Sequence, residues 1–130
     1  MAIREVEAHE AIEVKQLVCL FYGQPNAWKS SLCQTASNPV TLAADPGIYR
    51  ARGRKKTVFF DTWADVVGYD VTRYDTVVID TVGMMLDSLA AAIITENPKN
   101  GNRLGGLSLP GYGVLKSRFA AWAGDLRQRQ

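Results

Sequence analysis

The residues best suited to chemistry lie in the segment 23–30, Gly-Gln-Pro-Asn-Ala-Trp-Lys-Ser. This segment resembles the phosphate-loop pattern G-x-x-x-x-G-K-S/T, with Trp28 in the place of the second glycine. The backbone N–H groups of such a loop and of the following helix face phosphate oxygens. Lys29 is expected to reach the β- and γ-phosphates, and the Ser30 hydroxyl to bind Mg²⁺. We therefore predict a nucleotide site formed by Gly23, Asn26, Ala27, Trp28, Lys29, Ser30 and Ser31.

Two positions of this loop need a particular backbone. Asn26 tolerates the left-handed conformation that a phosphate nest requires. Trp28 brings a bulky indole and a Cβ that restricts φ, where glycine normally lets the loop wrap around the β-phosphate. A bound nucleotide would have to accept a distorted loop or a displaced indole. The alternative interpretation of the segment is a strand–turn–helix with a chance Lys-Ser pair.

A carboxylate at the end of a strand is the second chemical element. Asp80 ends the run Val77-Val78-Ile79-Asp80, the cleanest strand signal in the chain. In a parallel sheet an acid at this point lies beside the phosphate loop, where it can hold Mg²⁺ opposite Ser30. The alternative is a solvent-facing acid at a strand end. We predict ATP and Mg²⁺ as ligands, with Ser30 and Asp80 at the metal.

Strands and helices alternate along the chain, which predicts an α/β fold with a mostly parallel sheet flanked by helices. We expect strands at 15–22, 40–44, 57–60 and 75–80. We expect helices from Lys29 and at 62–68, 82–94 and 114–129, and a long mobile loop at 97–113. Residues 1–14 are interpreted as an arm or short helix, and 15–130 as a P-loop NTPase-like domain.

The composition fits one soluble domain. The chain has 130 residues, 47% of them apolar, and a net charge of +2, which is too small to imply nucleic acid by itself. No apolar run approaches the ~20 residues of a membrane span, so we expect a cytoplasmic protein with no membrane partner. Cys19 and Cys33 are expected to be reduced core thiols. His9 is the sole histidine, which excludes histidine-based triads.

The order FYGQPNAWKSSL, PVTLAADPG, TVFFDTWADVV, YDTVVIDTVGMMLDSL and LPGYGVLKSRFAAWAGDLRQ resembles the phage-encoded ATP-binding proteins of the RecA superfamily. These small ATPases are associated with phage recombination and single-strand annealing. The resemblance runs from about Lys15 to the C-terminus and is most specific at 74–87 and at 111–113. It implies a RecA-like P-loop core, with phosphate and Mg²⁺ at Lys29 and Ser30 and a Walker B acid at Asp80.

The resemblance also raises three further expectations. Asp45 follows the second expected strand, where RecA-like ATPases place the carboxylate that activates water; family members usually have Glu near this point. The alternative is a turn acid in Asp-Pro-Gly. Further core strands are expected after the last helix, so the chain is interpreted as a natural truncation or a reduced version. RecA-like relatives commonly form rings or filaments, which implies a homo-oligomer.

Basic residues suggest a polymeric partner. Phosphate contacts with single-stranded DNA could come from Arg52, Arg54, Lys99 and Arg103; the alternative is solvated loops. One function is therefore an ATP-binding protein of phage DNA recombination, with weak or absent hydrolysis, acting with single-stranded DNA. The other is a non-catalytic, truncated RecA-like phage protein that binds and inhibits a host or defence protein. Trp28 and the short C-terminus favour the second function, and the intact phosphate-loop and Walker B residues favour the first.

Overall fold

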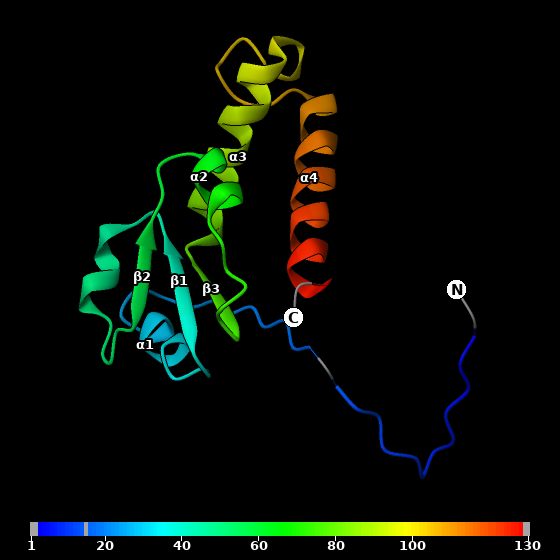
Figure 1. Cartoon of the computed structure of the whole chain (residues 1–130). Helices are drawn as coiled ribbons and strands as arrows, with labels where there is room; N and C mark the ends of the chain where they lie inside the picture. Colours follow the sequence, from blue (N-terminus) through cyan, green and yellow to red (C-terminus); the bar gives the residue numbers. More distant parts are fainter. Residues whose placement is uncertain (1–2, 15, 129–130) are drawn as a thin grey trace.

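A parallel sheet lies on one side of the molecule, to the left of the long helices in Figure 1. The computed structural model describes residues 3–14 and 16–128, and within them the sheet has the strand order β2-β1-β3. The strands are β1 (Pro39–Ala43), β2 (Lys56–Phe59) and β3 (Thr76–Asp80). β1 runs parallel to both neighbours, and its register brings Ala43 opposite Phe59 on one side and Asp80 on the other. The predicted parallel α/β arrangement is confirmed.

β1 is the most buried strand of this sheet. All five of its residues are buried, while those of β2 and β3 are mostly half-buried or exposed. A strand with a partner on each side and covered faces is typically apolar. Four residues of PVTLA are apolar, and the hydroxyl of the fifth, Thr41, accepts a hydrogen bond from buried Gln34.

Helices cover the sheet and extend beyond it (Figure 1). They are α1 (Lys29–Cys33), η1 (Pro46–Arg50), α2 (Trp63–Gly68), α3 (Val82–Glu96), η2 (Pro98–Asn100) and α4 (Leu109–Gln128). α2 begins with a capping box, in which Thr62 and Asp65 satisfy each other's backbone N–H groups. α3 and α4 pack side by side, and Arg118 of α4 bonds Glu96 at the end of α3 at 2.6 Å.

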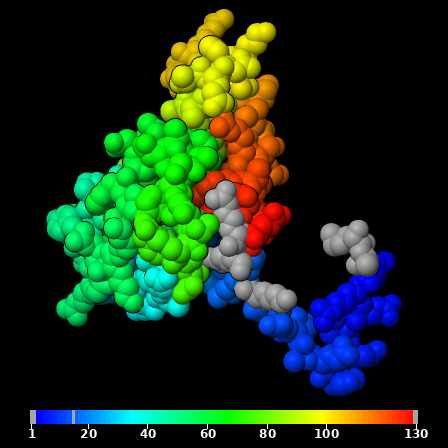
Figure 2. Space-filling model, viewed as in Figure 1, coloured from blue at the N-terminus to red at the C-terminus, as the bar shows by residue number. Residues whose placement is uncertain are grey.

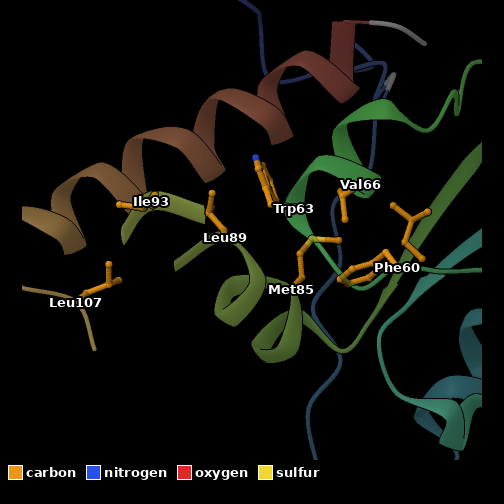
Figure 3. Close-up of a cluster of buried hydrophobic side chains, with 8 residues drawn as sticks. Phe60, Trp63, Val66, Met85, Leu89, Ile93 and Leu107 are labelled. Atoms are coloured by element: carbon orange, nitrogen blue, oxygen red, sulfur yellow. The ribbon is translucent and has the colours of Figure 1, made fainter. Parts of the chain in front are cut away.

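The hydrophobic core lies where α2 and α3 meet the sheet and α4 (Figure 3). Met85, Leu89 and Ile93 form the buried stripe of α3, with the spacing expected of a helix packed on one face. The stripe and its partners are Leu42, Phe60, Trp63, Val66, Met85, Leu89, Ile93 and Leu107. Trp122 of α4 contacts Trp63 edge to face, with 5.6 Å between ring centroids.

The predicted loop at 97–113 is shorter than expected. Its first part contains η2 and an isolated bridge between Gly101 and Leu107, and α4 already begins at Leu109. Proline is tolerated in the first turn of a helix, so Pro110 does not prevent this start. Gly111 is required there, because a Cβ would lie 2.3 Å from the Asn100 carbonyl oxygen. The glycine-rich segment thus marks a close helix packing contact.

The predicted strand at 15–22 is wrong for its described part, and residue 15 lies outside the described residues. Residues 16–22 form no strand and are exposed, with Leu17 at 80% and Tyr22 at 90% exposure. A strand needs a hydrogen-bonding neighbour, and among the described residues β3 pairs with β1 alone. An apolar run without such a neighbour remains extended chain.

The N-terminal segment lies apart from the body of the molecule. Residues 3–14 contain no helix and are exposed, and Figures 1 and 2 show this blue segment away from the sheet and helices. No helix in the described ranges is long and apolar enough to cross a membrane.

Candidate nucleotide-binding site

The phosphate loop has two left-handed residues. Asn26 has a φ of 65°, the conformation that we expected of a nest position, and Trp28 has φ 64° and ψ 19°. Trp28 is also the N-cap of α1, and its carbonyl accepts the first helical hydrogen bond from Leu32 at 2.9 Å. A left-handed conformation costs a residue with a Cβ roughly 1–2 kcal/mol. This cost explains why the phosphate-loop pattern has glycine where this chain has Trp28.

The two residues expected at a metal lie in direct contact. The Ser30 hydroxyl on α1 donates to the Oδ2 atom of Asp80, at the end of β3, over 2.5 Å. The Asp80 backbone is fixed as well, since its carbonyl accepts from Ala44 at the end of β1. A hydroxyl and a carboxylate are hard oxygen ligands of the kind that Mg²⁺ prefers, so these residues fit the ion. The structure brings Ser30 and Asp80 together although they are far apart in sequence.

The ammonium group of Lys29 rests on its own loop. Its Nζ atom donates to the carbonyl oxygens of Gly23 at 3.0 Å and Gln24 at 2.7 Å. An ammonium has three donors, so one is left by these two bonds. The contacts hold the positive charge over the loop from which it projects.

Asp45 has a different environment. Its carboxylate accepts from the Gly47 N–H at 2.8 Å and caps η1, directly after β1. Within the described part of the chain, no hydrogen bond or ion pair joins it to Lys29, Ser30 or Asp80. The contact that the structure gives Asp45 is that of a turn acid.

The four candidate DNA contacts do not form one patch. Arg52 and Arg54 lie between η1 and β2, whereas Lys99 and Arg103 lie between α3 and α4, and Figure 1 places these two loops at opposite ends of the molecule. All four side chains are exposed. Arg52 contacts the phosphate loop, with its guanidinium carbon 5.2 Å from the centroid of the Trp28 ring.

The two cysteines differ from expectation in one respect. Cys19 is exposed, so its prediction as a core thiol is wrong, because the strand that would bury it does not form. Cys33, at the end of α1, is half-buried, and neither thiol is in a disulfide. Burial raises the pKa of the Cys33 thiol, and the negative charge of nearby Asp80 raises it further.

Sequence reasoning missed two features near the site. Gln34, just after α1, is 2% exposed and bonds the Thr41 hydroxyl of β1 at 2.8 Å. A hollow of about 260 Å³ opens after the carboxyl ends of β1 and β2, beside α3, and is lined by Ala44, Phe60, Asp61, Met84, Asp87 and Ser88. Neither feature follows a sequence motif. For Gln34, the one available signal was a polar residue near the short helix predicted from Lys29.

Comparison with known protein families identifies the family of the chain. The family model described as "AAA domain" matches residues 15–129, which is most of the chain. No curated protein and no solved structure matches the chain. The matched range contains the phosphate loop, the strand ending in Asp80 and the parallel sheet between them. The chain belongs to the AAA domain family, a family of P-loop ATPases.

Proposed function

We propose that this protein binds Mg-ATP at the rim of the sheet where β3 ends. The observation that carries the proposal is the 2.5 Å hydrogen bond between Ser30 and Asp80. This hydroxyl and carboxylate lie next to a loop with two left-handed residues, the type of backbone from which anion-binding nests are built. Lys29 adds a full positive charge to the same loop.

Each of these residues has a distinct task in the proposed site. The Lys29 ammonium would exchange loop carbonyls for phosphate oxygens, which are stronger acceptors because they are charged. Ser30 and Asp80 would supply oxygen ligands to Mg²⁺. An ion held there would offset the negative charge of the phosphates.

Titration with a fluorescent ATP analogue, with and without Mg²⁺, tests this site. We expect micromolar or weaker binding that needs Mg²⁺ and is lost in Lys29→Ala. Lys116→Ala is the matched control, because it removes an exposed lysine from α4. Asp80→Asn should retain weak binding but lose the dependence on Mg²⁺. Equal affinities in Lys29→Ala and Lys116→Ala would contradict the proposal.

We further propose that the protein acts with single-stranded DNA in phage recombination, as its resemblance implies. Exposed cations support this role at two separate places, Arg54 in the turn between η1 and β2, and Lys99 with Arg103 between α3 and α4. A gel-shift assay at two salt concentrations tests it, because each phosphate contact adds to the salt dependence. Arg54→Ala and Lys99→Ala would identify the end that binds. An affinity insensitive to salt would rule the role out.

A second candidate is an interaction protein that does not turn over ATP and inhibits a host or defence protein. The exposed apolar residues Leu17, Leu20 and Tyr22 favour it, because such side chains usually lie at contacts with other proteins. A phosphate-release assay separates the two functions. Steady hydrolysis by the unaltered chain, abolished in Lys29→Ala, would exclude the second candidate.

A further inference from the structure

We propose that Arg52 is a phosphate-binding residue of the nucleotide site, held beside the phosphate loop by Trp28 and Ser31. Arg52 lies outside the phosphate-loop motif and far from it in sequence. The inference rests on the proposed binding of Mg-ATP and assigns one more residue to that site. It replaces the expectation that Arg52 contacts DNA.

The backbone of the turn that carries Arg52 is tied to α1 at two points. The Arg52 N–H donates to the Ser31 hydroxyl at 3.0 Å, and the Lys55 N–H donates to the Gln34 side-chain oxygen at 2.9 Å. Gln34 is buried and is itself fixed to β1 through Thr41. Since Ser31 directly follows the expected metal ligand, the turn is anchored to the wall of the nucleotide site.

The side chain of Arg52 approaches the loop from this anchored turn. Its guanidinium carbon lies 5.2 Å from the centroid of the Trp28 ring, within the range of a cation–π contact. A cation–π contact is electrostatic and uses none of the five guanidinium N–H donors, so these can bind an anion. Trp28 directly precedes Lys29 in the loop, whose ammonium is held by the Gly23 and Gln24 carbonyls of the same loop.

This contact differs from the other arginine–aromatic contacts in the described residues. Arg50 stacks on Tyr49 and Arg73 on Tyr74, each on its neighbour in sequence, so these contacts need no tertiary structure. Arg52 and Trp28 are brought together only by the fold. This tertiary contact adds a second cation, beside Lys29, to the surroundings of the phosphate loop, which favours an anionic ligand there.

Nucleotide affinity in Arg52→Ala tests this assignment. We expect the Kd for Mg-ATP to rise about tenfold, the effect of losing one hydrogen bond to a charged group. The matched control is Arg50→Ala, which removes an equal charge and a stacked arginine from the same basic stretch and should change the Kd less than about twofold. Arg52→Lys keeps the charge without the planar fork and should fall between them. Thermal unfolding of each variant measures whether the fold is retained.

The outcomes separate this inference from the function on which it rests. A tenfold loss in Arg52→Ala, partly rescued by Arg52→Lys, supports it. Equal losses in Arg52→Ala and Arg50→Ala would show an effect of net charge and would overturn it. Unchanged ATP binding in Arg52→Ala, with binding lost in Lys29→Ala, would overturn it alone. No Mg-ATP binding by the unaltered chain would overturn the proposed function, and this inference with it.

Discussion

The left-handed backbone at Trp28 predicts how substitutions there change nucleotide affinity. A residue with a Cβ pays roughly 1–2 kcal/mol at φ 64°, whereas glycine pays nothing for this conformation. Glycine loses more conformational entropy when the loop becomes ordered, which reduces this advantage by about 0.5–1 kcal/mol. The net gain is about 1 kcal/mol, or roughly a fivefold lower Kd. The gain appears as tighter binding, because the strain lowers the fraction of free protein whose loop has the conformation that binds nucleotide.

Comparing Trp28→Gly with Trp28→Ala isolates this backbone effect. Both variants lose the indole, and with it both the bulk and the contact with Arg52. The glycine variant should therefore bind the fluorescent ATP analogue about fivefold more tightly than the alanine variant. Trp28→Asn should fall between them, because asparagine tolerates the left-handed region. Equal affinities in the glycine and alanine variants would refute the argument and leave the bulk of the indole as the whole effect.

Other parts of the structure give three further predictions. Gly111→Ala should lower the free energy of unfolding by about 1–3 kcal/mol, and with it the thermal midpoint, because the new Cβ meets the Asn100 carbonyl. An unchanged midpoint would contradict this packing. Gln34→Ala should lower the free energy of unfolding in urea by about 1–3 kcal/mol, since one buried and one partly buried hydrogen bond are lost. The raised pKa of the Cys33 thiol leaves less thiolate at a given pH, so mass spectrometry should show iodoacetamide labelling exposed Cys19 first, with the Cys33 rate still rising above pH 9. Equal rates at neutral pH would contradict the burial.

The sheet shows what hydrophobic pattern can and cannot predict. The runs at 40–44 and 75–80 were predicted as strands and form β1 and β3, because each finds a parallel neighbour. The run at 15–22 has the same apolar character, yet its described residues pair with nothing and stay exposed. Strand propensity describes fit to a pleated surface with neighbours, and sequence alone does not say whether a neighbour exists.

The pairing of Ser30 with Asp80 survives this error for a physical reason. We expected a strand before the loop to carry Ser30 to the sheet edge. In the structure the link comes from after the loop, through the buried hydrogen bond between Gln34 and Thr41 of β1. β1 then sets Ala43 opposite Asp80 in register. Ser30 can be linked to this end of the sheet through the segment before the loop or through the segment after it. The predicted proximity of Ser30 and Asp80 therefore depended on the parallel sheet more than on the strand at 15–22.

The position of Arg52 could not be predicted because it depends on two polar side chains, Ser31 in the short helix α1 and Gln34 directly after it. Along the sequence, Arg50, Arg52 and Arg54 form one basic stretch with no feature to distinguish them. In the fold, the guanidinium of Arg50 lies over its neighbour Tyr49. Arg52 instead lies over Trp28, on a turn that is tied to α1 by a hydrogen bond from the Arg52 N–H to Ser31 and one from the Lys55 N–H to Gln34. Charge along a chain gives the number of cations in a segment; hydrogen-bond acceptors on a neighbouring element decide which of them faces a ligand. Replacing the Ser31 hydroxyl, which holds the Arg52 backbone, should therefore weaken nucleotide binding even though that hydroxyl carries no charge.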